Sequence, residues 1–594
     1  MATTLLSPSA VHYRIEAPQV HHHRFQVTLT IAQPDAQQIV SLPVWIPGSY
    51  LVREFSRHLQ GLQARQGRRT LAVTQLDKCT WRIDARSDTP LQLRYEVYAF
   101  DPSVRAAWLD AQRGFFNGTS LCLRVHGQES QPHQLELMPV PGHADWQVAT
   151  GLTPVRCNRR GFGVYQAEDY DEVVDCPVEM GLFWSGAFKA CGIEHQMVVA
   201  GAPPGFDGAR LLGDTQRICE TAIRFWHGSG AQAGRRAPHR RYVFMLNAVH
   251  DGYGGLEHRN STALIASRAD LPREGDSGKP RAGYVTLLGL ISHEYFHTWN
   301  VKRLRPDAFA RYDYTQENYT ELLWFFEGFT SYYDDLLLRR AGLIDDATYI
   351  GLLGKTIEQV LHTPGRRVQT VAQASLDAWI KYYRMDENTP NATVSYYTKG
   401  ALVALCLDLS LRQEGHTLDA VLRGLWQRCA EGPMREQDLL DELQAQTGRS
   451  WQSELKAWVH STEELPLASL LQGSGVRIHT EPASLSQRLG IRAVDGPSGV
   501  QIKSVLRDSP AEQAGLAAND ECVGLEVGAR SEGGSWRITK LEEAAQLLGR
   551  SRQGRWLVSR DRRLLRLAFR LPASASVWRL EAPASVAPGH WPLA

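Results

Sequence analysis

Residues 284–300 read YVTLLGLISHEYFHTWN, an apolar run that ends in an H-E-x-x-H motif formed by His293, Glu294 and His297. The apolar run predicts a helix that is packed inside a domain. Residues four apart on a helix lie on the same face, so His293 and His297 can direct two imidazoles at one metal ion. Glu294 would lie beside that ion, where its carboxylate could take a proton from water. Because the motif also occurs by chance on buried helices, further ligands are needed to support a metal site.

A carboxylate further along the chain offers the third ligand. Glu327 lies in the apolar, aromatic segment of residues 324–330, and it comes 30 positions after His297. A buried charge needs a partner, and two histidines with one glutamate leave a fourth position on a zinc ion open for water. The alternative is a salt bridge from Glu327 to Arg339 or Arg340, which lie three helical turns away. We favour the ligand interpretation, with one Zn²⁺ ion per chain.

A short glycine-rich segment precedes a strand predicted at residues 261–266. It contains Gly254, Gly255 and Glu257. Glycines before a strand allow another chain or a ligand to approach the backbone closely. Glu257 has two interpretations, since it can be an exposed turn residue or a fixed anion that faces a cleft.

Two tyrosines stand at the entrance of a helix predicted over residues 401–411. They are Tyr396 and Tyr397, within the sequence SYYTKG of residues 395–400. A tyrosine in this position can simply pack against its neighbours, or it can reach the cleft and donate a hydrogen bond to an oxyanion. The spacing alone does not distinguish between these roles.

The composition is ordinary for a globular protein, with 43% hydrophobic and 22% charged residues among 594. The net charge of +1 gives no global field that favours nucleic acid or membrane, so neither is expected as a partner. The N-terminus does not resemble a secretory signal, and 18 consecutive apolar residues occur nowhere. The nine cysteines are scattered without a C-x-x-C pair, which is typical of reduced thiols, and we therefore expect a cytoplasmic location.

The length predicts three to five domains, and the fold class predicted is multidomain α+β. Residues 25–31 and 91–98 alternate apolar and polar side chains, as strands of an antiparallel β domain do. A mixed α/β part and then a mainly helical part follow, with a helix expected at residues 215–225 and a buried strand at 241–246. After residue 473 short strands return. The predicted divisions are 1–180, 181–470, 473–572 and an Ala-, Pro- and Ser-rich, loose tail at 573–594.

Residues 473–572 resemble a PDZ domain. The resemblance rests on GVQIKSV at 499–505, SPAEQAGL at 509–516 and NDECV at 519–523, and the sequence RLGI at 488–491 is similar to that family's carboxylate-binding loop. A helix expected at 539–548 would flank the peptide groove. Domains of this kind bind chain ends by strand addition, so the resemblance implies a peptide ligand with a free C-terminus.

The order of these segments resembles the glycyl aminopeptidase family of zinc metallopeptidases, which belong to the gluzincin group. The segments LPVWIPGSY at 42–50, RGFFNGTS at 113–120, HEYFHTWNVKR at 293–303, WFFEGFT at 324–330 and SYYTKGA at 395–401 carry the resemblance. It implies a thermolysin-like, mainly helical catalytic domain within residues 181–470. It also implies that His293, His297 and Glu327 hold zinc, and that Glu294 is the general base.

The wider zinc aminopeptidases carry a G-x-M-E-N segment, whose glutamate binds the free amine of the substrate. Gly254 to His258 is similar to this segment, but leucine replaces the methionine and histidine replaces the asparagine, which leaves the role of His258 open. Those enzymes also place a catalytic tyrosine two residues before a Lys-Gly pair, the position of Tyr397. The family preference is for an N-terminal glycine, with alanine next.

Together these observations predict a zinc aminopeptidase whose partners are peptides with a free N-terminus. Two alternatives remain: a peptide-binding adaptor that uses the PDZ-like groove and has a vestigial metal site, and a zinc endopeptidase. The sequence does not indicate the physiological substrate, the residues that set the glycine preference or the oligomeric state.

Overall fold

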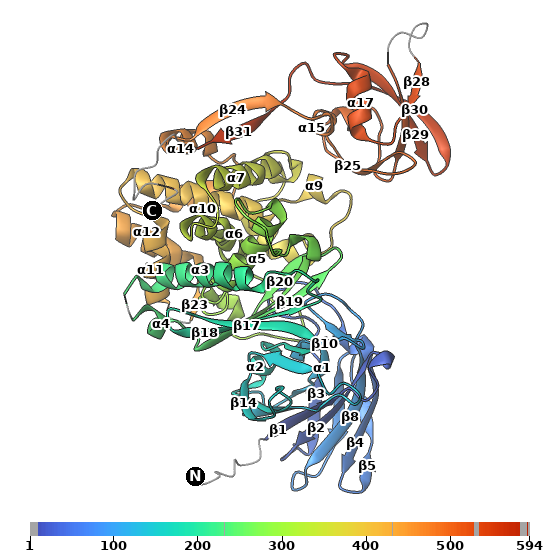
Figure 1. The fold of residues 1–594 in the computed structure, drawn as a ribbon, viewed down its shortest axis with the longest axis vertical. Helices are drawn as coiled ribbons and strands as arrows, with labels where there is room; N and C mark the ends of the chain where they lie inside the picture. Colours follow the sequence, from blue (N-terminus) through green and yellow to red (C-terminus); the bar gives the residue numbers. More distant parts are fainter. Residues whose placement is uncertain (1–9, 231, 430–431, 528–533, 583–590, 592–594) are drawn as a thin grey trace. The chain divides into compact units, whose positions relative to one another are not determined.

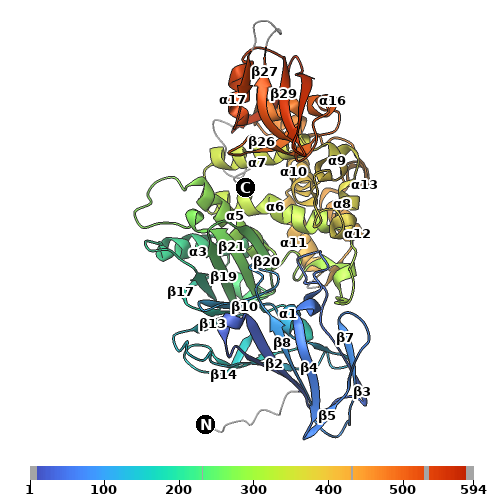
Figure 2. The ribbon, with the colours of Figure 1, turned by 90° about the vertical axis from the view of Figure 1, so that its right-hand side faces the viewer.

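The computed structural model describes residues 10–230, 232–429, 432–527, 534–582 and Trp591. The chain divides into two compact units, which we call the first and the second unit. The first unit comprises Met1–Tyr319, Tyr333–Ile344 and Leu422–Arg435, and the second comprises Thr320–Tyr332, Asp345–Val421 and Glu436–Ala594. Figures 1 and 2 label the elements of both units. Within the described ranges, no helix is long and apolar enough to cross a membrane.

The N-terminal part of the first unit is made of β-sheets. The strands β2 (Arg24–Ile31) and β8 (Leu91–Tyr98) bury every second side chain, which confirms the strands predicted there. The other elements are β1 (Val11–Glu16), β3 (Gln37–Ser41), β4 (Leu59–Gln66), β5 (Arg69–Leu71), β6 (Val73–Gln75), β7 (Thr80–Asp84), β9 (Ala107–Leu109), β10 (Arg113–Phe116), α1 (Gly118–Leu121), β11 (Arg124–Val125), β12 (His133–Leu137), β13 (Gln147–Thr150), β14 (Thr153–Cys157), β15 (Gly163–Ala167), α2 (Tyr170–Val174) and β16 (Val178–Gly181).

These strands form three sheets around one buried apolar core. An eight-stranded sheet has the order β14-β15-β12-β1-β2-β8-β4-β5, and two four-stranded sheets have the orders β13-β16-β10-β9 and β11-β3-β7-β6. The domain differs from the prediction in one respect, because β1 pairs with β12 in parallel. The chain between these strands is long enough for the crossover that a parallel pair needs, so the sheet is mixed and not purely antiparallel.

A five-stranded sheet with the order β17-β18-β19-β21-β20 follows in the first unit. Its strands are β17 (Phe183–Ala190), β18 (Ile193–Ala200), β19 (Arg241–Val249), β20 (Tyr253–Glu257) and β21 (Ser261–Ser267). The helix α3 (Gly208–His227) packs against β17, and α5 (Ala282–Phe296) packs against β20 and β21. The predicted helix and both predicted strands are confirmed, and β20 lies at the edge of the sheet next to α5.

Two helices run through the division between the units without a break: α6 (Leu323–Arg340) and α11 (Leu418–Arg428). The first unit also contains α4 (Ala233–Arg236) and the paired strands β22 (Arg305–Pro306) and β23 (Pro433–Met434). The second unit contains α7 (Asp346–Leu361), α8 (Val371–Leu376), α9 (Thr389–Ala392), α10 (Tyr396–Gln413), α12 (Glu436–Thr447), α13 (Gln452–Trp458) and α14 (Leu467–Gly473). The predicted change to mainly helical structure is confirmed, and the helix expected at 401–411 lies within α10.

The C-terminal part of the second unit is again a sheet with its own apolar core. Its path is β25 (Ile491–Asp495), β26 (Val500–Val505), β27 (Glu521–Glu526), β29 (Gln553–Arg560) and β30 (Arg563–Arg570), while β28 (Ser535–Arg537) pairs with β27. The helices are α15 (Leu485–Leu489), α16 (Pro510–Gln513) and α17 (Leu541–Leu548), and Figure 2 shows α17 and α16 flanking the strands.

The prediction of a loose tail at residues 573–594 is wrong for the part that the structure describes. Residues 583–590 and 592–594 lie outside the described ranges. The strand β31 (Ser576–Glu581) pairs with β24 (Arg477–Pro482) along its whole length and contacts α7 (Figure 1). Trp591 is buried, and its indole N–H donates to the hydroxyl of Tyr332 at 3.0 Å. Alanine, proline and serine set the composition of the tail, but its two tryptophans, Trp578 and Trp591, have the apolar surface that favours docking.

Candidate metal and peptide site

The two histidines of the H-E-x-x-H motif lie at the C-terminal end of α5. His293 is in the last turn of the helix, and His297 caps it in helical conformation, so the two rings occupy the same face. The Nε2 atoms of His293 and His297 are 3.0 Å apart. His297 is buried, and His293 is half-buried. The helix buries nearly all of its side chains, as its apolar sequence predicts, which fixes the direction of both rings.

Each histidine is oriented through its other ring nitrogen. Nδ1 of His293 lies 3.1 Å from a carboxylate oxygen of Asp334, and Nδ1 of His297 lies 2.8 Å from the carbonyl oxygen of Asn300. A carbonyl and a carboxylate can only accept hydrogen bonds, so both histidines carry the proton on Nδ1. In the neutral imidazole this leaves a lone pair on each Nε2, and that tautomer is the one in which histidine binds a metal through Nε2.

Glu327 approaches the histidines from α6. It is a buried carboxylate, and one ligand atom from each of Glu327, His293 and His297 lies within 4.8 Å of the others. Asp334 follows Glu327 by seven residues, two turns along the same face of α6, so one continuous helix carries both Glu327 and the carboxylate behind His293. The alternative salt bridge does not suit this geometry, because Arg339 is twelve residues further on, about 18 Å along the helix axis.

The three side chains fit a zinc ion. Two nitrogens bound to one tetrahedral zinc at 2.0–2.1 Å lie about 3.4 Å apart, close to the 3.0 Å between the two Nε2 atoms. Two lone pairs that face each other at this distance repel each other unless a cation lies beside them. The buried carboxylate of Glu327 supplies the negative charge that such a cation requires.

The carboxylate of Glu294 lies against the backbone of β20. It is buried, and a Cβ atom added to Gly255 would lie only 2.0 Å from its Oε1. The strand therefore passes Glu294 more closely than any residue with a side chain would allow. Gly254 has φ +155°, a conformation that residues with side chains rarely adopt. The predicted need for glycine in this segment thus has a physical cause at both positions.

Glu257 is the last residue of β20, and its carboxylate faces a turn of the β-sheet part. Of the two interpretations of Glu257, the exposed turn residue is therefore wrong. Glu257 is 4% exposed, and a Cβ atom at Gly48, which has φ +91°, would lie 2.5 Å from its carboxylate. A second contact also reaches β20 from the β-sheet part, because Arg105 donates a hydrogen bond to the carbonyl of Gly255 at 3.3 Å. Sequence reasoning did not identify Gly48 or Arg105. The Pro-Gly pair at 47–48 is typical of a turn, but nothing in the sequence relates it to Glu257.

The two tyrosines of α10 differ in burial. Tyr396 is fully buried, while Tyr397 is half-buried and stacks on Tyr382 with ring centroids 5.4 Å apart. Burial raises the pKa of Tyr397 well above its usual value, and the negative charge of Glu327 raises it further. Tyr397 is thus a neutral hydroxyl near Glu327, and Tyr396 is the more deeply buried of the two tyrosines.

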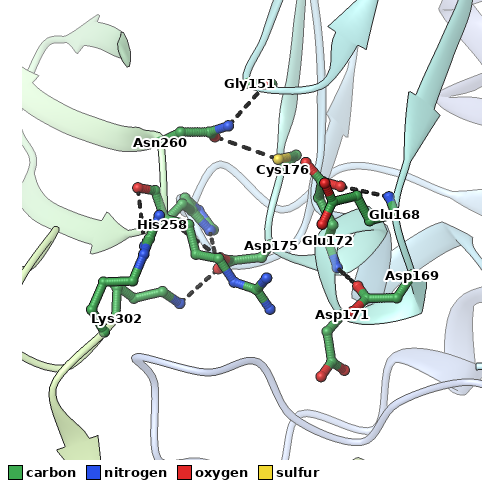
Figure 3. A network of polar contacts seen from close by, with 12 residues as sticks. Gly151, Glu168, Asp169, Asp171, Glu172, Asp175, Cys176, His258, Asn260 and Lys302 are labelled. Carbon is green, nitrogen blue, oxygen red and sulfur yellow. Dashed lines mark hydrogen bonds and ion pairs between the residues drawn. The ribbon is translucent and has the colours of Figure 1, made fainter. Parts of the chain in front are cut away.

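His258 directly follows the last residue of β20, Glu257, and its side chain is buried. Its Nδ1 lies 3.2 Å from Asp175, which also binds the ammonium of Lys302 at 2.6 Å (Figure 3). The sequence left the role of His258 open, and the structure places this residue in a buried polar network with Asp175 and Lys302.

Comparisons with known proteins found both related families and related structures. The Peptidase M61 N-terminal domain matches residues 12–182, and the M61 glycyl aminopeptidase family matches residues 286–403. The structure of an aminopeptidase N family protein from Idiomarina loihiensis is similar, with a TM-score of 0.90 and 37% identity over 96% of this chain and 98% of that one. An M1 zinc metallopeptidase from Deinococcus radiodurans has a TM-score of 0.49 and 16% identity, over 77% and 94% of the two chains. No curated protein matches the chain in sequence.

The alignment with the Idiomarina protein covers nearly the whole of both chains, and the two M61 matches cover the β-sheet part and the segment with the H-E-x-x-H motif. These findings confirm the predicted peptidase family, the N-terminal β-sheet domain and the helical peptidase domain. The chain therefore belongs to the M61 peptidase family and is an aminopeptidase-like metallopeptidase.

Proposed function

We propose that this metallopeptidase is a zinc-dependent aminopeptidase that removes N-terminal residues from peptides. The path of the strand β20 supports the proposal. Gly255 lies against Glu294, and Glu257 follows two residues later on the same face of the strand. Residues two apart on a strand are separated by about 6–7 Å. This separation matches one extended residue of about 3.5 Å plus one hydrogen bond of about 2.9 Å. Glu257 would thus bind the substrate's ammonium one residue away from the bond that Glu294 helps to break.

His293, His297 and Glu327 would hold one Zn²⁺ ion per chain. When bound, zinc polarises the scissile carbonyl and lowers the pKa of a water ligand to near 7. The carboxylate of Glu294 would accept the proton of the attacking water and pass it to the nitrogen of the leaving amine. The close approach of Gly255 limits the positions that this carboxylate can adopt, which supports its role as an oriented base.

Tyr397 would donate its hydroxyl proton to the oxyanion of the tetrahedral intermediate. A donor must stay protonated, and burial together with the charge of Glu327 holds the pKa of Tyr397 well above neutral pH. Donors in comparable oxyanion holes contribute about 3 kcal/mol to transition-state stabilisation.

The expected substrates are peptides with a free N-terminal glycine, and alanine comes next. The glycyl aminopeptidase description of the matched family supports this preference. All nine cysteines lie within the described residues and none of them forms a disulfide, which supports a reducing, cytoplasmic environment.

A panel of chromogenic aminoacyl substrates tests the proposal, each with a free and an N-acetylated amine and each with and without a chelator. Wild-type protein should cleave the free glycyl substrate fastest, lose activity with the chelator and barely cleave the acetylated analogue. Glu257→Ala should lose about 10- to 150-fold in kcat/KM on the substrate with a free amine. This loss corresponds to one charge-assisted hydrogen bond of about 1.5–3 kcal/mol. Equal cleavage of free and acetylated substrates by wild-type protein would contradict the proposal and favour an endopeptidase.

A second candidate function concerns residues 485–571, which we propose form a PDZ-like domain. The strand β25 forms one edge of the sheet, with α17 anchored to it by a hydrogen bond from the Leu541 amide to Asp495 at 2.9 Å. Gly490 adopts φ +71° in the loop before β25. An edge strand beside a helix supports binding of an extended peptide by strand addition. Titration with a fluorescent peptide that has either a free or an amidated C-terminus would test carboxylate recognition, and equal binding of the two would contradict it.

A further inference from the structure

A cavity of about 370 Å³ lies within the second unit, and none of the proposed active-site residues lines it. Its lining residues belong to the end of α7, the start of α10, the segment that leads into α14, and β31, elements that are labelled in Figure 1. The volume is within the range of about 300–1,000 Å³ that is usual for small-molecule sites. Seven of the twelve lining residues are apolar, among them Leu361, Leu465, Leu467 and Trp578. The cavity can therefore hold the apolar part of a small ligand.

One residue that lines this cavity is a buried lysine. Lys399 lies in the first turn of α10 and is 2% exposed. Its Nζ forms no hydrogen bond with any of the described residues. Burying an ammonium group is strongly unfavourable unless an opposite charge or a hydrogen-bond acceptor accompanies it. The position of Lys399 therefore favours an anionic partner that enters through the cavity.

The charged groups that act on Lys399 already pair with each other. Arg366 also lines the cavity, and its Nε donates to the two carboxylate oxygens of Glu464 at 3.1 and 3.2 Å. Burial lowers the pKa of Lys399, the carboxylate of Glu464 opposes this change, and the guanidinium of Arg366 adds to it, so that the net change is downward. Glu463, the other acidic residue of the lining, is exposed. The carboxylate of Glu464 is thus engaged by Arg366, while the amine of Lys399 remains for a ligand.

Lys399 is separate from the proposed oxyanion donor, although it follows Tyr397 by only two residues. Successive residues of an α-helix are turned by about 100°, so side chains two apart project from nearly opposite sides of α10. Tyr397 stacks on Tyr382, whereas Lys399 shares its cavity with the segment that leads into α14. A ligand bound to Lys399 would therefore occupy a site other than the one proposed for the peptide.

We propose that this cavity binds a fatty carboxylate, with the carboxylate on the ammonium of Lys399 and the hydrocarbon chain against Leu361, Leu465 and Trp578. One cation without a partner balances one negative charge, which suits a carboxylate better than a phosphate group of charge about −1.5 to −2. The apolar walls favour a hydrocarbon chain over a peptide, because the amide groups of a peptide would lose hydrogen bonds to water there. The inference does not depend on the proposed aminopeptidase activity.

The test is isothermal titration calorimetry of the full-length protein with octanoate and with octanol, which share an eight-carbon chain and differ in charge. Wild-type protein should bind octanoate about 10- to 150-fold more tightly than octanol, the factor expected for one charge-assisted hydrogen bond. Lys399→Met should bind the two probes with equal affinity, because it loses the partner of the carboxylate and keeps the apolar walls.

The matched control is Lys355→Met, since Lys355 is exposed on α7 and does not line the cavity. This variant should keep the wild-type preference for octanoate. Without a probe, Lys399→Met should melt at or above the temperature of wild-type protein, because an apolar side chain of similar length replaces a buried amine. Removal of the metal with a chelator should leave the affinity for octanoate unchanged, which separates this cavity from the metal site.

Four outcomes would overturn the inference. Equal binding of octanoate and octanol by wild-type protein is the first, and it requires no variant to fold. A preference for octanoate that persists in Lys399→Met would place the carboxylate elsewhere. A large drop in the melting temperature of Lys399→Met, or its failure to fold, would show that Lys399 has a structural partner within the protein, such as Glu464. Loss of octanoate binding with the metal would assign the carboxylate to the metal site.

Discussion

Replacing Gly255 with alanine should displace the carboxylate of Glu294 and lower the rate of peptide hydrolysis. The added Cβ would lie 2.0 Å from Oε1, 2.4 Å from Cδ and 2.6 Å from Cγ of Glu294. Real Cβ contacts stay beyond 3.0 Å, so the strand and the carboxylate must separate by at least about 1 Å. Glu294 is buried on a packed helix and has little space into which it can retreat.

The expected loss is about 10²-fold in kcat/KM. A misplacement of about 1 Å in an active site costs about this factor, and complete loss of a general base costs about 10² to 10⁴. A factor of 10² corresponds to about 2.7 kcal/mol in the activation free energy. Because the alanine contacts Glu294 and not the three ligands, the zinc content should stay at one ion per chain.

The assay is a double-mutant cycle with Glu294→Gln, measured on a free glycyl substrate with metal analysis of each protein. If Gly255→Ala acts through Glu294, it should cost less than about threefold when added to Glu294→Gln, because the base has already been removed. A further hundred-fold loss in that background would refute the reasoning. Gly213→Ala is the matched control, since a Cβ at Gly213 in α3 meets no atom within 4 Å and the activity should not change.

Three further predictions concern the metal and the oxyanion. Glu327→Ala should lose zinc in metal analysis, because a catalytic site needs three protein ligands, and full metal content would remove Glu327 from the ligand set. Asp334→Asn should weaken zinc affinity by about 10- to 100-fold in a chelator competition, since it orients His293, and an unchanged affinity would contradict that role. Tyr397→Phe should lower kcat by about 10²- to 10³-fold with KM nearly unchanged, whereas Tyr396→Phe should keep its kcat; the reverse result would place the donor one residue earlier.

The parts of the site that the sequence predicts are those governed by local periodicity. The spacing of four between His293 and His297 places them on one face of a helix whatever the rest of the chain does. Glu327 stands out as the one carboxylate in an aromatic segment that had to be buried. Asp334 carried a usable signal as well, because it follows Glu327 by seven residues and shares its helix face.

The parts that the sequence does not predict depend on contacts between distant segments. Gly48 lies against Glu257, which is about two hundred positions further on, and Arg105 reaches the carbonyl of Gly255 across 150 positions. A glycine that touches a carboxylate leaves no periodic pattern, since its role is to lack a side chain. The prediction of a loose tail failed for a related reason. Composition describes the average residue of a segment, whereas Trp591 is a single residue whose side chain is buried.

His258 shows how a departure from a family pattern is interpreted from the contacts of the side chain in the structure. The similarity to G-x-M-E-N places this histidine next to the proposed amine-binding carboxylate, which suggests a direct effect on the substrate. The structure instead brings Nδ1 of His258, the residue after the end of β20, to 3.2 Å from the carboxylate of Asp175. His258 therefore belongs to the buried polar network of Asp175 and Lys302, and the amine-binding role that we propose for this segment falls to Glu257.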